Sequence, residues 1–195
     1  MKFLKLLAIP LISFFLIILI DFFFGKYIIN FIVVNNKPVI ENSIYHHDLK
    51  KNINKKQTYN KIYNYILCTN EYGFKSDCDK KKYSKRIDYA FIGDSFTEGV
   101  GLNYSDTFVG LFSQNKKNKS VANLGVESYS PKIYYKKLEY LLDNGFQFNR
   151  VIVFLDLADI FDENLYFIEN NNIKKKGAIK SINTIYQNYD NIFKF

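Results

Sequence analysis

The stretch that decides the fold is a short apolar run followed by a polar cluster, Tyr89-Ala90-Phe91-Ile92-Gly93-Asp94-Ser95-Phe96-Thr97-Glu98-Gly99. A short, continuously apolar run is typical of a strand that is buried on both faces of a parallel sheet. Gly99 allows the chain to turn tightly after the polar cluster. The pattern therefore predicts a buried strand that exposes the hydroxyl of Ser95 at the edge of the sheet.

Two more strands and two helices follow this run. The pattern predicts a helix over 107–114, a strand over 120–124, a helix from Ser130-Pro131 to Asn144-Gly145 and a strand over 150–155. A serine cap with proline at the first helical position is a common helix start, and Asn-Gly is a common stop. This order predicts an α/β protein with a doubly wound parallel sheet of the flavodoxin-like, three-layer kind.

Polar residues collect where each of the three predicted strands ends. They are Asp94-Ser95 after the first strand, Gly125 after the second and Asp156 to Asp159 after the third. Ligand sites in open parallel sheets lie beyond the carboxyl ends of the strands. We therefore expect the functional site at this edge.

The first 34 residues differ from the rest of the chain. Lys2 and Lys5 precede an apolar run, Leu6–Phe24, in which Ser13 and Asp21 are the only clearly polar side chains. A helix of about 20 apolar residues spans the hydrocarbon core of a bilayer, and positive charge before it favours a cytoplasmic N-terminus. We expect residues 1–34 to be a single-pass transmembrane anchor, with the body exported to the periplasmic or extracellular face. A cleaved signal peptide is the alternative, but its apolar region is normally only about 7–15 residues.

Residues 35–86 are polar and turn-rich, and they predict an irregular segment ahead of the sheet domain at 87–195. Cys68 and Cys78 are predicted to form a disulfide, because an exported body meets an oxidising environment. No metal site is expected from two cysteines without a nearby histidine. The net charge of +8 is spread along the body, and its tightest run, Lys80–Lys82, lies in a loop. No nucleic-acid partner is therefore expected.

The stretch Phe91–Gly99 resembles the first sequence block of the SGNH, or GDSL-type, hydrolase family. Asn123-Leu124-Gly125-Val126-Glu127-Ser128-Tyr129-Ser130 resembles the second block, and Leu155-Asp156-Leu157-Ala158-Asp159-Ile160 lies where the third is expected. The resemblance implies an ester hydrolase or O-acyltransferase that acts on envelope carbohydrate or lipid esters and needs no cofactor. It implies that Ser95 is the nucleophile, that the backbone N–H groups of Ser95 and Gly125 face the oxyanion, that Asp94 holds the turn and that Asp159 orders the third loop.

The chain departs from the family pattern at two places. Ala158 stands where the family usually presents an asparagine that completes the oxyanion hole, and losing one such donor costs roughly 2.7–4 kcal/mol. The family's Asp-x-x-His block, which supplies the general base, has no counterpart, because no histidine follows His47. Three explanations stay open. The chain is a fragment whose sheet is incomplete at the C-terminus, His46 or His47 supplies the base from upstream, or the protein is a non-catalytic scaffold or binding protein of the cell envelope.

Overall fold

The computed structural model describes residues 2–25, 37–79 and 83–176. The chain divides into two compact units, Met1–Pro38 and Val39–Phe195. The lysine run 80–82 lies outside the described residues.

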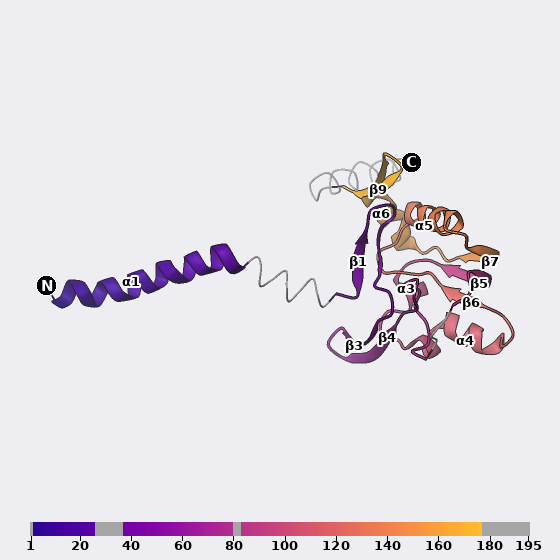
Figure 1. Ribbon diagram of the computed structural model, residues 1–195, viewed down its shortest axis with the longest axis horizontal. Coiled ribbons are helices and arrows are strands. Elements are labelled where there is room, and N and C mark those ends of the chain that lie inside the picture. The colour runs from indigo at the N-terminus through magenta and orange to yellow at the C-terminus, as the bar shows by residue number, and fades with distance from the viewer. Residues whose placement is uncertain (1, 26–36, 80–82, 177–195) are drawn as a thin grey trace, which may run out of the picture. The chain divides into compact units, whose positions relative to one another are not determined.

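The first unit contains helix α1, Lys2–Ile20, and a π-helical turn, Asp21–Gly25 (Figure 1). The prediction of a transmembrane helix is wrong: among the residues that the structure describes, no helix combines the length and the apolar character needed to cross a membrane. The predicted apolar run Leu6–Phe24 is not one α-helix, because α1 ends at Ile20 and the π-helical turn follows it.

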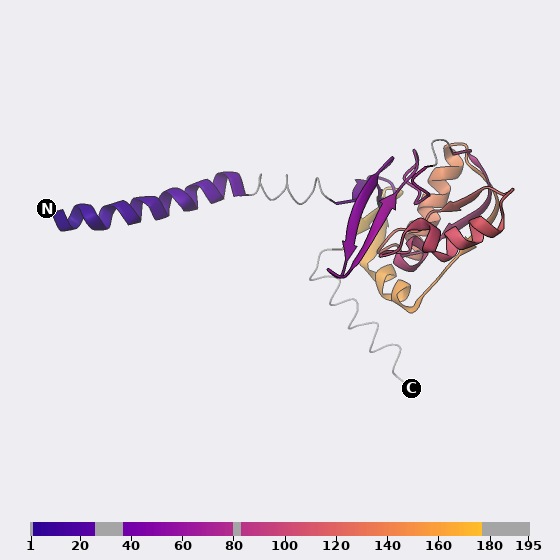
Figure 2. The same cartoon turned by 90° about the horizontal axis from the view of Figure 1, so that it is seen from below.

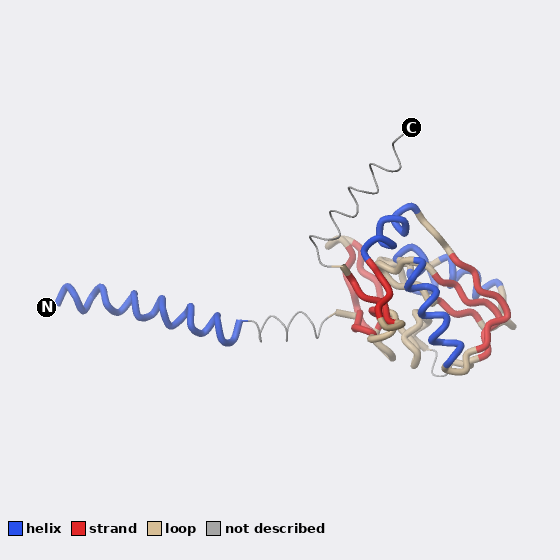
Figure 3. Tube along the Cα trace, turned by 90° about the horizontal axis from the view of Figure 1, so that it is seen from above, coloured by secondary structure: helices blue, strands red, loops and turns tan. Residues whose placement is uncertain are grey.

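The second unit is built around a three-stranded parallel sheet with the order β6-β5-β7. Its strands are β5 (Arg86–Ile92), β6 (Val121–Asn123) and β7 (Gln147–Val153). β5 is central, since Ala90 pairs with Ala122 on one side and with Val151 on the other. In Figure 3 these strands form a red layer with helices beside it. The three predicted strands are therefore present, and they are parallel.

The prediction of a doubly wound, flavodoxin-like sheet is nevertheless wrong, because within the described ranges the parallel sheet stops at three strands. After β7 the chain forms helix α6 (Leu157–Leu165) and then the strands β8 (Tyr166–Glu169) and β9 (Asn172–Lys175). β8 and β9 pair with each other in an antiparallel hairpin. Its turn is closed by two asparagines at positive φ, a conformation that asparagine tolerates better than most residues.

Residues 39–68 form two antiparallel pairs, so the prediction of an irregular segment over 35–86 is also wrong. The paired strands are β1 (Val39–Asn42) with β2 (His46–Leu49), and β3 (Asn54–Tyr59) with β4 (Tyr63–Cys68). Figure 2 shows this part of the chain in purple, with its long arrows lying side by side. Lys55 and Lys56 of β3 pair with Leu67 and Ile66 of β4, so strand pairing has overridden the low strand preference of lysine.

Three helices follow β5 and lie between the parallel strands in the sequence. They are α3 (Ser95–Glu98), α4 (Phe108–Asn115) and α5 (Pro131–Asp143), with a 3₁₀ turn at Tyr104–Asp106 before α4. The predicted start of α5 at Ser130-Pro131 and its stop at Asn144 are confirmed.

Two hydrophobic clusters share strand β5. The larger contains Ala90 and Ile92 with residues of α5, of β2 and β4, and of the β8–β9 hairpin. The smaller joins Phe91 to Val109 of α4 and to Val121 of β6. Successive side chains of a strand point to opposite faces, which explains why neighbouring β5 residues enter different clusters. This packing fixes the carboxyl end of β5, where Ser95 follows.

Candidate active site

The Ser95 turn, residues 94–99, is a single helical turn with a cap at each end. Asp94 begins it, because its Oδ1 accepts the N–H of Phe96 at 2.9 Å. Gly99 ends it at φ 72°, where its N–H donates to the carbonyl of Ser95 at 2.9 Å. The hydroxyl of the half-buried Ser95 donates to Oδ2 of Asp94 over a long 3.4 Å. Asp94 therefore both starts the turn and contacts the candidate nucleophile.

The second loop, residues 125–128, packs directly on this turn. A Cβ atom on Gly125 would lie 2.5 Å from the backbone nitrogen of Glu98 and 2.8 Å from the carbonyl carbon of Thr97. Only glycine permits this approach. The N–H of Gly125 donates to Oδ1 of Asn123 at 3.0 Å, so serving an oxyanion would require it to leave that acceptor.

Asn123 is a site residue that sequence reasoning missed. It ends β6 and is 1% exposed, and its Nδ2 donates to the carbonyl of Thr97 at 2.8 Å. Its side chain therefore joins the second loop to the Ser95 turn. A polar residue at the end of a buried strand was the available signal, since buried polar groups require partners.

The third loop, residues 154–159, leads from β7 into α6. Asp156 caps α6 by accepting the N–H groups of Ala158 and Asp159, and Oδ2 of Asp159 accepts the N–H of Asp156 at 3.0 Å. The hydroxyl of Tyr134 on α5 donates to Oδ1 of the buried Asp159 at 2.9 Å. Asp159 thus joins α5 to the third loop, whereas the Ala158 side chain offers no donor.

Three carboxylates meet at this edge of the sheet. Oxygen atoms of Asp94, Asp156 and Asp159 lie within 4.8 Å of one another. Burial raises the pKa of Asp94, and the charges of Asp156 and Asp159 raise it further. A site of oxygen ligands alone suits Mg²⁺ or Ca²⁺. Each of these carboxylates, however, already accepts at least one of the hydrogen bonds described above.

The two histidines lie on the other side of the second loop. Nε2 of His47 is 2.9 Å from the carbonyl of Glu127, so this nitrogen must carry the proton and donate. Nδ1 of a neutral His47 then accepts from Nδ1 of His46, at 2.7 Å. Burial is the main reason that the pKa of His47 is lowered to about 4. In the described part of the chain, neither imidazole hydrogen-bonds to Ser95, so the structure does not bring His46 or His47 together with the nucleophile.

Glu98 and Lys75 are two further residues that sequence reasoning missed. Glu98 is 3% exposed, and its Oε2 accepts the N–H of Glu127 at 2.7 Å. Burial raises the pKa of Glu98 to about 7. Nζ of the buried Lys75 donates to the carbonyls of Gly99 and Leu102 at 2.7 and 2.8 Å, and burial lowers its pKa to about 8. No spacing rule marks either residue, because their partners lie 24 to 29 positions away.

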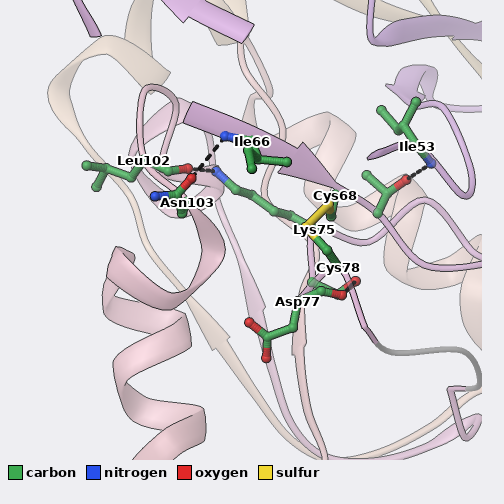
Figure 4. The surroundings of a disulfide bond; sticks show 10 residues. Ile53, Ile66, Cys68, Lys75, Asp77, Cys78, Leu102 and Asn103 are labelled. Carbon is green, nitrogen blue, oxygen red and sulfur yellow. Dashed lines mark hydrogen bonds between the residues drawn. A yellow bond between two sulfur atoms is a disulfide. The ribbon is translucent and has the colours of Figure 1, made fainter. Parts of the chain in front are cut away.

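Cys68 and Cys78 form a disulfide beside Lys75 (Figure 4). The N–H of Ser76 donates to the carbonyl of Cys68 at 3.0 Å, and the backbones of Thr69 and Lys75 form an isolated antiparallel β-bridge. In Figure 4 the Lys75 side chain extends from this linked segment to Leu102. The disulfide therefore closes the segment that carries one of the supports of the Ser95 turn.

Comparisons with protein-family models, with curated proteins and with solved structures find no match to this chain. The resemblance to SGNH hydrolases therefore stays a prediction that rests on the three sequence blocks.

Proposed function

We propose that the protein acts on acyl esters through Ser95, either by hydrolysis or by O-acyl transfer. The observation that carries the proposal is the support around Ser95: its turn is held by Asp94, by Asn123 from β6 and by Lys75 from the segment after β4. A nucleophile reacts efficiently when the surrounding structure holds it in one position relative to its substrate, and these contacts hold the backbone of the turn. The substrate class, a carbohydrate or lipid ester, rests on the family resemblance alone.

In the proposed reaction the Ser95 oxygen attacks the acyl carbonyl and the alcohol leaves. Water or a second alcohol then releases the acyl group from Ser95. The proton of Ser95 passes to a base and from it to the oxygen of the leaving alcohol, and the base that this structure offers is Asp94 at 3.4 Å. The raised pKa of Asp94 improves it as a base, but the long contact predicts slow attack.

The test is labelling of the purified full chain with a fluorophosphonate probe, which reacts with activated serines. We expect slow labelling that is lost in Ser95→Ala and reduced in Asp94→Asn. Ser105→Ala is the matched control, because Ser105 lies outside the turn and its hydroxyl contacts Asp106. Labelling that persists in Ser95→Ala would refute the assignment of the nucleophile.

A binding scaffold is the second candidate, and two observations favour it. The N–H of Gly125 donates to Asn123, the two histidines are hydrogen-bonded to each other, and His47 also donates to the carbonyl of Glu127. Both features withhold groups that an active hydrolase would use. Absence of labelling in a chain that is folded by circular dichroism would favour this candidate over the enzyme.

The body is proposed to work in an oxidising compartment, outside the cytoplasm. The disulfide between Cys68 and Cys78 supports this, since such bonds are rare in reducing compartments. The measurement is thiol alkylation during lysis of expressing cells. Alkylation of both cysteines before reduction would contradict the proposal.

A further inference from the structure

The peptide backbone of Glu127 is held on both sides by side chains from distant parts of the chain. Its N–H donates to Oε2 of Glu98 at 2.7 Å, and its carbonyl accepts from Nε2 of His47 at 2.9 Å. Glu98 ends α3, one helical turn after Ser95, whereas His47 lies in β2. The side chain of Glu127 is exposed and takes no part in these two contacts.

Both holding side chains are buried and confined. His47 packs edge-on against the ring of Tyr129, with centroids 4.9 Å apart, and its second nitrogen is bonded to His46. The carboxylate of Glu98 is buried, so a hydrogen bond that it loses is not replaced by bulk water. These constraints leave the Glu127 peptide little freedom to move.

The second loop also contains a backbone conformation that needs support. Ser128 has φ 63°, which residues other than glycine seldom adopt, and the hydroxyl of Tyr166 donates to its carbonyl at 3.2 Å. Gly125, at the start of the loop, touches the backbone of Glu98 and Thr97. A shift of the loop would therefore change its fit against the Ser95 turn.

We infer that His47 and Glu98 are positioning residues that hold the second loop in register with the turn carrying Ser95. This inference rests on the proposed function, because the register matters for chemistry only if Ser95 reacts. It gives the upstream histidine a role different from that of a general base. It also gives the Ser95 turn a second role, since Glu98 within this turn holds the second loop.

The experiment measures amide hydrogen exchange and fluorophosphonate labelling in the same full-chain samples. Glu98→Ala removes the acceptor of the Glu127 N–H, and His47→Ala removes the donor to the Glu127 carbonyl. Glu98→Gln keeps an acceptor oxygen, and His47→Gln keeps an N–H donor, at about the same distance from the backbone. We expect the alanine variants to raise exchange of the Glu127 amide roughly tenfold or more, and the glutamine variants to stay within roughly threefold of the original chain. Labelling of Ser95 should slow about tenfold or more in the alanine variants and recover in the glutamine variants. Glu169→Gln is the matched control, because Glu169 is exposed on β8.

The two readouts separate this inference from the proposed function. Unchanged exchange at Glu127 in both alanine variants would overturn the inference, whatever the labelling shows. Raised exchange at Glu127 in the alanine variants, with no labelling of the original chain, would support the positioning role of His47 and Glu98 and refute the proposed enzymatic activity. Where an alanine variant loses protection in β5 as well, the fold has opened, and the glutamine variants decide: failure of both to restore Glu127 protection overturns the inference.

Discussion

Replacing Lys137 tests whether the β1–β2 hairpin is fixed to helix α5 by a buried ion pair. Nζ of Lys137 on α5 lies 2.9 Å from Oδ1 of Asp48 in β2, and the lysine side chain is 0% exposed. The two residues are 89 positions apart in the sequence. Lys137→Met keeps an unbranched, apolar side chain of nearly the same length while it removes the charge.

The magnitude follows from what the substitution leaves behind. Removing one partner of a buried ion pair costs roughly 3–5 kcal/mol, because the remaining charge is uncompensated. Asp48 keeps two donors, the hydroxyl of Tyr45 at 2.7 Å and the N–H of Leu49 at 2.9 Å, and the Tyr129 hydroxyl, which donates to the carbonyl of His47, lies 3.3 Å away. We therefore expect the lower end of the range, a loss of about 3 kcal/mol in the free energy of unfolding. In the double variant with Asp48→Asn the loss should fall short of the sum of the single losses by about 1–3 kcal/mol.

The assay is urea unfolding of the full chain, followed by circular dichroism at constant pH. The matched control is Lys132→Met, which breaks the half-exposed pair with Glu163 at 2.8 Å and should cost only about 0–1 kcal/mol. Equal losses for Lys137→Met and Lys132→Met would refute the reasoning. Strict additivity in the double variant would show that Lys137 and Asp48 do not stabilise each other.

Three other substitutions or treatments test separate parts of the structure. Gly125→Ala should destabilise the chain by about 1–3 kcal/mol and slow labelling of Ser95, because the new Cβ atom would lie 2.5 Å from the backbone nitrogen of Glu98. An unchanged free energy of unfolding in urea would contradict this prediction. Reducing the bond between Cys68 and Cys78, whose separation is 10 residues, should lower the free energy of unfolding by roughly 2–3 kcal/mol, with the double alanine variant as the control that does not respond to reductant. The pKa of His47 is lowered to about 4, so the folded protein favours the neutral imidazole. The free energy of unfolding should therefore fall by up to about 3 kcal/mol as the pH falls from about 6.5 towards 4. His47→Gln should reduce this pH dependence without abolishing it, because burial also lowers the pKa of His46. An identical pH dependence in urea unfolding of the two proteins would show that His47 does not contribute to it.

Local patterns predicted the central part of the fold, because its signals lie within short stretches. The apolar run at Tyr89–Ile92 became the central strand, and α5 begins at Pro131 as the Ser-Pro pair predicted, although the Ser130 side chain makes no capping hydrogen bond. These elements depend on neighbours a few positions away. The sequence therefore reports them directly.

The remaining parts were missed because they depend on contacts between distant positions. Lysines in β3 hid a strand whose stability comes from pairing with β4. At the site, Glu98 acquires its role from Glu127, 29 positions further on, and Asp48 from Lys137. Periodicity and spacing contain no information about such pairs.

The third loop bears most directly on the choice between an enzyme and a scaffold. Its donors and acceptors are used within the fold: the N–H of Ala158 donates to Asp156, and the carboxylate oxygens of Asp159 accept from the hydroxyl of Tyr134 and from the N–H of Asp156. The loop is therefore built as a helix cap that closes on itself. The Ser95 turn is built differently, since Asn123, Lys75 and Glu98 are buried polar residues that fix its backbone or the loop beside it. Burying polar and charged groups is costly unless they are satisfied, and a satisfied network holds one geometry. Among the described residues, several buried polar side chains thus support the turn that carries Ser95, and for this reason we propose ester chemistry at Ser95 rather than a scaffold.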